Sequence, residues 1–200
     1  MRRALSVMLL ALLAGCAAGP GTGDLARLAS EAPVELPARY TCFHACGPIV
    51  VDGWLDEPCW GMAPSTGRFR LTADGAADAP PTRAKMLWYE GVLYVAFECA
   101  DEDVYATFLR RDEALYSQDV VEVFISEQTL GKGHFLEYEF SPLGTLFDSY
   151  VVRPFQGRTD WDSSGLAARA IVYGTQNRPG DRDGGYVVEI AIPLAGLFTD

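Results

Sequence analysis

The sequence has little histidine and little positive charge, and both shortages exclude classes of protein. Its 200 residues include 2 histidines, and neither a Gly-x-Ser-x-Gly nor a His-Glu-x-x-His pattern occurs, which disfavours nucleophilic hydrolysis by a histidine triad and a helical zinc-protease site. Lys and Arg number 16 against 27 Asp and Glu, for a formal net charge of -11. Such a charge makes attraction to phosphate backbones unfavourable, so we expect no nucleic-acid partner.

The chain also lacks an apolar run long enough to cross a bilayer, although it begins with a shorter one. Two arginines precede the apolar residues 4–14, whereas a transmembrane helix needs about 20 residues. This arrangement is typical of a secretory signal peptide, which we do not expect to fold. Leu13-Ala14-Gly15-Cys16 closes the run and is similar to the bacterial lipobox, whose cysteine is diacylated and becomes the first mature residue. We therefore predict a lipoprotein signal peptide over residues 1–15 and lipidation of Cys16.

Cleavage before Cys16 predicts an acidic protein anchored at the bacterial cell envelope. It removes two arginines and no acid, so the mature charge is -11 - 2 = -13. Residues 16–39 are rich in Gly, Pro and Ala without a period of 2 or 3.6, which predicts a flexible tether. The acyl chains on Cys16 are then the membrane contact, on the periplasmic or extracellular face.

Four further cysteines lie in the body of the chain: Cys42, Cys46, Cys59 and Cys99. An exported location permits disulfides, four thiols allow three pairings, and Cys42 with Cys46 is a local candidate. His44 lies between these two, but two thiols and one imidazole lack a fourth ligand at any standard zinc spacing. Cys99 ends an alternating segment, and we expect it to pack as a small hydrophobe.

From about residue 48 onward the dominant hydrophobic period is 2. In residues 93–99 every second residue is apolar on one face, which predicts a half-buried strand. Turn signals such as Glu90-Gly91, Gly131-Lys132-Gly133 and Asp183-Gly184-Gly185 separate such segments. With no long amphipathic helix to compete, we predict an all-β fold over residues 40–200, an antiparallel β-sandwich of immunoglobulin or jelly-roll-like kind. The predicted strands are 49–51, 84–89, 93–99, 120–125, 136–140, 145–152, 166–173 and 186–192.

Aromatic residues are abundant, with 4 Trp, 9 Tyr and 10 Phe. This exceeds what a small core easily buries, and exposed rings often serve recognition. Saccharides suit such rings because a pyranose presents C–H groups on its faces and hydroxyls around its rim. For Trp60 and Trp88 the simpler interpretation is burial in the core.

Two acidic clusters, Asp101–Asp103 and Asp181–Asp183, offer hard oxygen ligands. Neither continues through the calcium-loop pattern to a terminal Glu, so we interpret them as solvated turn acids. A structural calcium is the alternative interpretation. Carboxylate pairs are numerous enough to permit acid–base glycoside hydrolysis, but nothing in the sequence favours it.

Four segments, taken in order, resemble family 9 carbohydrate-binding modules. Residues 49–60 (IVVDGWLDEPCW) are similar to the family's opening, an apolar strand, Asp-Gly and an acidic turn ending in Trp. The other segments are 85–101, 118–125 (QDVVEVFI) and 184–193 (GGYVVEIAIP), so that the resemblance covers residues 48–197. It implies a DOMON-like β-sandwich that binds saccharides without catalysis, in proteins that often also carry glycoside hydrolase domains.

The resemblance also implies site residues. A sugar-stacking ring falls on Tyr116, three residues before Asp119, and carboxylates that reach sugar hydroxyls fall on Asp101 and Glu122. Capping of the turn after its strand is the alternative role for Asp101. Arg111 adjoins Tyr116 in a polar loop where a guanidinium can donate to vicinal hydroxyls, and Trp88 is a further ring candidate.

Two family positions differ here, because an Arg and an Asn on the next strand align with Glu139 and Ser141. The family's second Trp ring lies in a C-terminal segment without a counterpart in these residues. The sequence also stops soon after a predicted strand, which is typical of a truncated domain.

Two other functions remain open beside saccharide binding. Related DOMON sandwiches hold haem for electron transfer, which here would need axial ligands from Met62, Met86, His44 or His134. An envelope protein-interaction module, with Tyr116 contacting a protein, is the other. A glycosidase using Asp101 or Glu122 is the least favoured.

Overall fold

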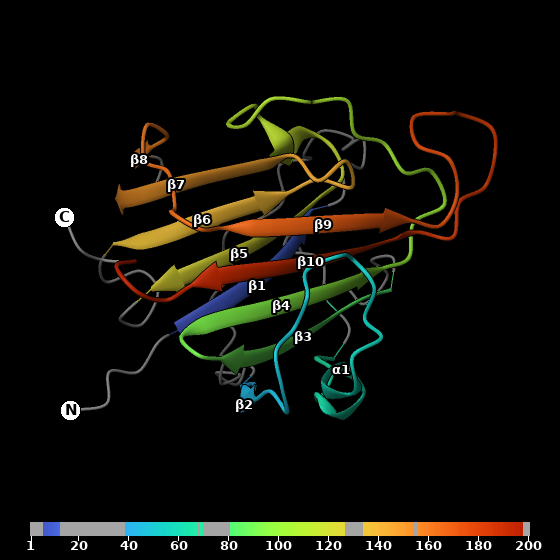
Figure 1. The fold of residues 1–200 in the computed structure, drawn as a ribbon. Coiled ribbons are helices and arrows are strands. Elements are labelled where there is room, and N and C mark those ends of the chain that lie inside the picture. Colours follow the sequence, from blue (N-terminus) through green and yellow to red (C-terminus); the bar gives the residue numbers. More distant parts are fainter. Residues whose placement is uncertain are drawn as a thin grey trace, which may run out of the picture.

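Two five-stranded β-sheets form a sandwich in the computed structural model (Figure 1). The structure describes residues 6–12, 39–67, 69, 81–126, 134–153 and 156–197. All pairings are antiparallel except the parallel pair β2–β3. The first sheet has the order β1 (Ser6–Leu12), β5 (Val120–Ser126), β6 (Phe135–Phe140), β7 (Leu146–Arg153) and β8 (Gln156–Arg158). The second has the order β2 (Phe43–His44), β3 (Thr82–Tyr89), β4 (Val92–Cys99), β10 (Tyr186–Pro193) and β9 (Ala167–Val172).

The main core lies between the two sheets, as the alternation predicts. Val95 and Phe97 of β4 and Val123 and Tyr138 of the opposite sheet have no exposed surface. These strands therefore turn every second side chain inward. The all-β sandwich prediction is confirmed, and Cys99 packs in this core as a small hydrophobe.

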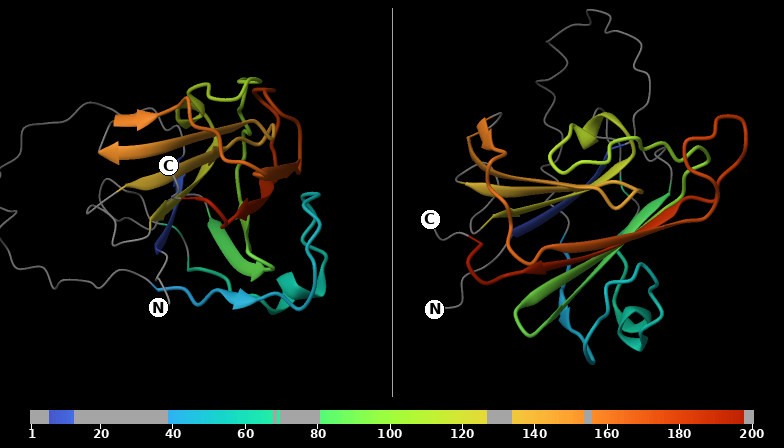
Figure 2. Two further views of the ribbon diagram at one scale, coloured as in Figure 1. Left: turned by 60° about the vertical axis from the view of Figure 1, so that its left-hand side comes forward. Right: turned by 45° about the horizontal axis from the view of Figure 1, so that its top comes forward.

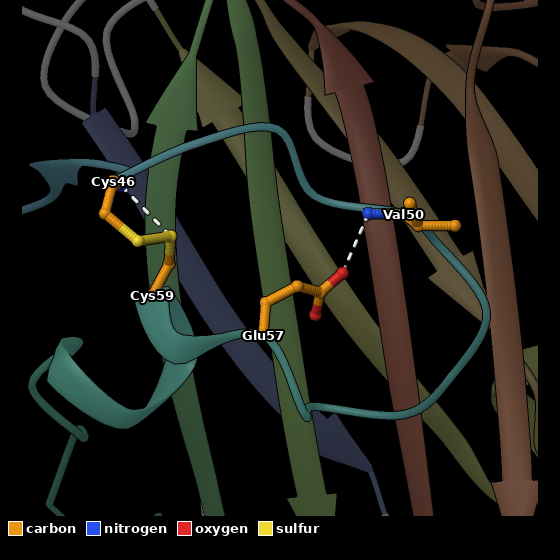
Figure 3. The surroundings of a disulfide bond; sticks show 4 residues. All are labelled: Cys46, Val50, Glu57 and Cys59. Atoms are coloured by element: carbon orange, nitrogen blue, oxygen red, sulfur yellow. Dashed lines mark hydrogen bonds between the residues drawn. A yellow bond between two sulfur atoms is a disulfide. The ribbon is translucent and has the colours of Figure 1, made fainter.

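A second apolar cluster covers the other face of the β3–β4–β10 sheet. The segment 45–63, including helix α1 (Pro58–Met62), crosses that face. Trp60 is fully buried there, which confirms the core interpretation for this ring. The predicted strand at 49–51 is wrong: the Val50 N–H donates to Glu57 Oε1 at 2.9 Å instead of to a neighbouring strand (Figure 3).

The disulfide joins Cys46 to Cys59, not to the local candidate Cys42 (Figure 3). Strand β2 lies between Cys42 and Cys46. Extended chain rises about 3.3 Å per residue, so these two cysteines lie farther apart than the roughly 7 Å between Cα atoms that a disulfide can bridge. The Cα atoms of Cys46 and Cys59 are 5.4 Å apart. Cys42 is a free, half-buried thiol, and burial raises its pKa to about 11.

Strand β1 is formed by part of the apolar run near the N-terminus, which we expected not to fold. It pairs with the edge of β5 over its whole length, with Leu10 opposite Glu122. An uncharged, extended segment satisfies the free N–H and C=O groups of a sheet edge. The predicted tether lies almost wholly outside the described residues, as does the turn at 131–133. In the part of the chain that is described, no helix has the length and apolarity to cross a bilayer.

Candidate functional site

A long loop between β4 and β5 carries the candidate ring, Tyr116, at one end of the sandwich (Figure 2). Buried side chains hold this loop. Asp119 Oδ2 accepts from the Tyr105 N–H at 2.6 Å, and Gln118 Oε1 accepts from the Thr107 N–H at 2.6 Å. A 3-10 turn over Leu115–Ser117 then turns Leu115 inward and leaves Tyr116 60% exposed. Tyr116 is thus an exposed ring on an anchored backbone.

Glu122 and Glu139 lie directly opposite each other on β5 and β6. Val121 and Val123 face the core, so Glu122 and its partner point to the other face of this sheet. Both residues are only 2% exposed. The backbone N–H of Tyr116 lies close enough to the Glu139 carboxyl to lower its pKa, which places the loop that carries the exposed ring against the acid pair.

The pKa values of both acids in this pair are raised well above the ordinary value of a glutamate. Burial, with the charges of Glu139 and Glu137 adding to it, raises the pKa of Glu122 to about 8. Burial and the charge of Glu137 raise the pKa of Glu139 to about 7, against the opposing effect of the Tyr116 N–H. Burial also raises the pKa of Glu137. Two adjacent carboxyls that resist ionisation can hold protons and donate, as well as accept, hydrogen bonds.

Asp101, the other predicted carboxylate, lies on the opposite side of β5. Its Oδ1 accepts from the Asp103 N–H at 3.0 Å, so it closes the turn after β4 as the capping alternative predicts. It couples to Asp119, whose pKa rises to about 6, first through burial and then through the charges of Asp101 and Asp103. Because Asp119 shares a face with the inward-pointing Val121, this acidic cluster and Glu122 occupy different faces of the sheet.

Arg111 forms ion pairs with carboxylates. Its guanidinium pairs with the fully buried Asp148, and its Nε lies 2.6 Å from Asp162 Oδ1. Asp148 also accepts from the Ser163 N–H at 2.6 Å. Burial raises the pKa of Asp148, although that N–H and Arg111 both oppose the rise.

The same place gathers three carboxylates that could hold a cation. Oxygen atoms of Asp112, Asp148 and Asp162 come within 4.8 Å of one another. Within the described ranges, this is the group of three or more potential metal ligands that lie this close together. The Arg111 guanidinium already supplies positive charge there. The two acidic clusters that the sequence suggested for calcium form no such group among the described residues.

Asp183 corrects the solvated-acid interpretation of one of those clusters. It is only 6% exposed, and its two oxygens accept from the Val104 N–H at 2.8 Å and the Thr175 N–H at 2.7 Å. The carboxylate therefore ties the loop before β10 to the loop after β4, at the same end of the sandwich (Figure 2).

Trp88 is not brought to Tyr116. It pairs with Leu93 at the start of β4, whereas the Tyr116 loop leaves from the end of β4 at Cys99. Six residue steps of strand, at about 3.3 Å each, separate those points by roughly 20 Å. The ring is 42% exposed and meets His44 edge-on at 4.5 Å between ring centroids, so its expected burial in the core is wrong.

The four candidate haem ligands lie in different surroundings. Met86 is buried in the core and Met62 is 68% exposed. His44 packs on Trp88, and His134 Nδ1 lies 2.7 Å from the Tyr150 hydroxyl. Among the described residues, no hydrogen bond or ring contact joins any two of these four side chains.

Sequence reasoning noted Glu139 only as a departure from the family pattern and did not place it in the site. The sequence does show that Glu137 and Glu139 share one face of a predicted strand, and that Glu122 lies in another predicted strand. Register between β5 and β6 was the missing information.

Comparison with known proteins identifies the class of this sandwich. Residues 51–200 match the model of the carbohydrate family 9 binding domain-like family. The chain therefore belongs to this family of carbohydrate-binding modules.

Two solved structures share the fold. A proposed carbohydrate-binding protein from Bacteroides uniformis aligns with a TM-score of 0.61 at 12% identity, over 81% of this chain and 75% of that one. A family 9 carbohydrate-binding module from Caldicellulosiruptor kristjanssonii, solved with cellotriose, aligns with a TM-score of 0.52 at 19% identity, over 77% and 67% of the two chains. A comparison with curated protein sequences found no match.

Proposed function

We propose that this protein binds a saccharide without catalysis, at a site formed by Tyr116, Glu122 and Glu139. The observation that carries the proposal is that the loop with the exposed Tyr116 ring lies, through its backbone N–H, against a buried carboxyl pair. The ring offers a flat apolar surface to the C–H face of a sugar, and the carboxyls offer hydrogen bonds to its hydroxyls. Family membership and the cellotriose held by the C. kristjanssonii module support a saccharide as the ligand.

The anchored loop supports a role in binding. Asp119 and Gln118 fix the backbone on either side of the turn that presents Tyr116. A ring on a fixed backbone loses less conformational freedom when a ligand stacks on it, which favours affinity. Asp101 and Arg111 act in this proposal as supports for that loop, because each is held by groups of the loop or of β7.

We propose the bacterial cell envelope as the location. The arginine pair, the apolar run and Leu13-Ala14-Gly15-Cys16 support cleavage before Cys16 and acylation of that residue. An anchored binding module would hold saccharide near the cell surface, in carbohydrate catabolism and alongside glycoside hydrolases.

Calorimetry on the full chain with neutral mono- and oligosaccharides tests the binding proposal. Saturable binding without release of reducing sugar is expected. Turnover of a glycoside that is lost in Glu122→Gln would instead establish an enzyme. Absence of binding to every saccharide, with the protein folded, would overturn the proposal and favour the protein-interaction alternative.

A further inference from the structure

The candidate saccharide site gathers three carboxyl groups, and no described Lys or Arg forms a salt bridge with them. Glu122, Glu137 and Glu139 lie on the same face of β5 and β6. Opposite Glu139 and Glu137, strand β7 places Phe147 and Ser149, which are uncharged. No salt bridge reaches the three glutamates from a described Lys or Arg.

The arginines nearest in sequence are engaged elsewhere. Arg110 binds Glu113 with 2.9 Å between Nη2 and Oε1, and Arg111 binds Asp148 and Asp162. Neither guanidinium can serve the glutamates without breaking these pairs. A positive charge at the site must therefore come from outside the described chain.

One carboxyl oxygen at the site has no hydrogen-bond partner among the described residues. Glu139 is only 2% exposed, and its Oε2 makes no hydrogen bond with any described residue. Nearly all buried polar atoms in folded proteins are paired, because an unpaired one keeps the cost of its lost hydration. It belongs to the residue that pairs with Glu122 across the strands and that lies near the backbone of the Tyr116 loop. The site thus presents an unused acceptor next to an exposed ring.

We propose that the site takes a saccharide bearing a primary amine, of the glucosamine type, in preference to a neutral sugar. The inference rests on the proposed saccharide function and names its ligand class. An ammonium group carries three donors and one positive charge, so it can bridge Glu122 and the free Oε2 of Glu139 while the sugar face stacks on Tyr116. A hydroxyl has a single donor and no charge. The raised pKa of each glutamate supports this assignment, because a cation relieves the repulsion that contributes to it.

Access to the acids depends on strand β1. In the described chain β1 flanks β5, with Leu10 opposite Glu122. Because β1 is the outermost strand of its sheet, its loss leaves β5, β6, β7 and β8 paired. Cleavage before Cys16 would remove β1 and open that side of the pair to a ligand.

Three trisaccharides that differ only at the C2 substituent test the preference: cellotriose with hydroxyls, chitotriose with amines and its N-acetylated form. The full-length gene is expressed in a bacterial host, mass spectrometry establishes the processed N-terminus, and calorimetry measures each affinity. We expect chitotriose to bind at least about tenfold more tightly than either neutral ligand. We also expect it to release protons from the acid pair, seen as a heat that depends on the buffer's ionisation enthalpy.

Matched variants distinguish binding of the amine at this site from a general attraction of the amine to an acidic protein. Glu139→Gln and Glu122→Gln should remove most of the preference for the amine, whereas Glu98→Gln, an exposed acid on β4, should leave it unchanged. Equal binding of cellotriose and chitotriose would overturn the inference and leave the saccharide proposal standing. Binding of none of the three would overturn both, and an equal loss in Glu98→Gln would show that the amine acts through net charge alone.

Discussion

At the scale of single residues, Glu189 explains why two distant segments of the family pattern occur together. This fully buried carboxylate accepts from the Asp52 and Gly53 N–H groups through Oε2 and from the Trp60 indole through Oε1, each at 3.0 Å. Gly53 has a φ of 90°, and a Cβ there would come within 2.8 Å of the Ile171 side chain. The Asp-Gly turn, the Trp and the late Glu are thus one structural unit.

Glu189→Gln should lower the free energy of unfolding by about 1–3 kcal/mol. The amide keeps one acceptor oxygen and turns an NH₂ group toward a donor, so at least one of the three hydrogen bonds is lost. Urea unfolding of the variant measures the loss. The exposed Glu98→Gln should stay within about 0.5 kcal/mol of the wild type, and equal stability of both variants would contradict the role given to Glu189.

At the scale of elements, the alternation of apolar and polar residues predicts most strands of the sandwich. It predicts neither the register between neighbouring strands nor the segment 45–63 that covers the second sheet. The strands from β3 to β7, with β9 and β10, follow the predicted periodicity closely. Periodicity says nothing about which strands are neighbours, so the facing of Glu122 and Glu139 and the separation of Trp88 from Tyr116 had to come from the structure. The disulfide pairing stayed open among three possibilities for the same reason, because helix α1 brings Cys59 to Cys46 from 13 residues away.

Removing the disulfide should destabilise the sandwich. A bridge that closes a loop of about 15 residues contributes roughly 3 kcal/mol by restricting the unfolded chain, and a loss of that order is expected for Cys46→Ser with Cys59→Ser. Chemical unfolding with and without reductant measures it. Reductant should lower the stability of the wild type and leave the double variant unchanged; a wild type indifferent to reduction would contradict the prediction.

The β5–β6 acid pair should make stability depend on pH. The folded-state pKa values, about 8 for Glu122 and about 7 for Glu139, exceed the ordinary value of 4.5. The folded state therefore binds more protons than the unfolded state in this window, and stability is greatest below about pH 4.5 and falls as the pH rises toward about 8. Urea unfolding across this range measures the slope.

Glu122→Gln should flatten that slope and be more stable than the wild type near pH 8, since its amide stays neutral. Glu98→Gln provides the control and should keep the wild-type slope. A wild-type stability that rises between about pH 5 and about pH 8 would contradict the assignment.

At the scale of the whole molecule, the proposals assign to the N-terminal segment both the location of the protein and the access to its site. Cleavage before Cys16 would change the formal charge from -11 to -13 and release the edge of β5. Mass spectrometry of the protein from bacterial membranes should find an acylated N-terminal Cys16. Cys16→Ser should abolish acylation and membrane retention; retention of an unacylated, uncleaved chain would contradict the lipoprotein assignment.

The most direct test of the central claim is saccharide binding by the processed full chain with Tyr116→Ala beside Tyr173→Ala. Both tyrosines are about half exposed, at 60% and 49%, but Tyr116 is the one of the two whose backbone N–H lies against Glu139. We predict that calorimetry with the best-binding trisaccharide will show at least about a tenfold loss of affinity in Tyr116→Ala and none in Tyr173→Ala, with both variants as stable as the wild type. Unchanged binding in Tyr116→Ala would place the saccharide elsewhere and contradict the site described here.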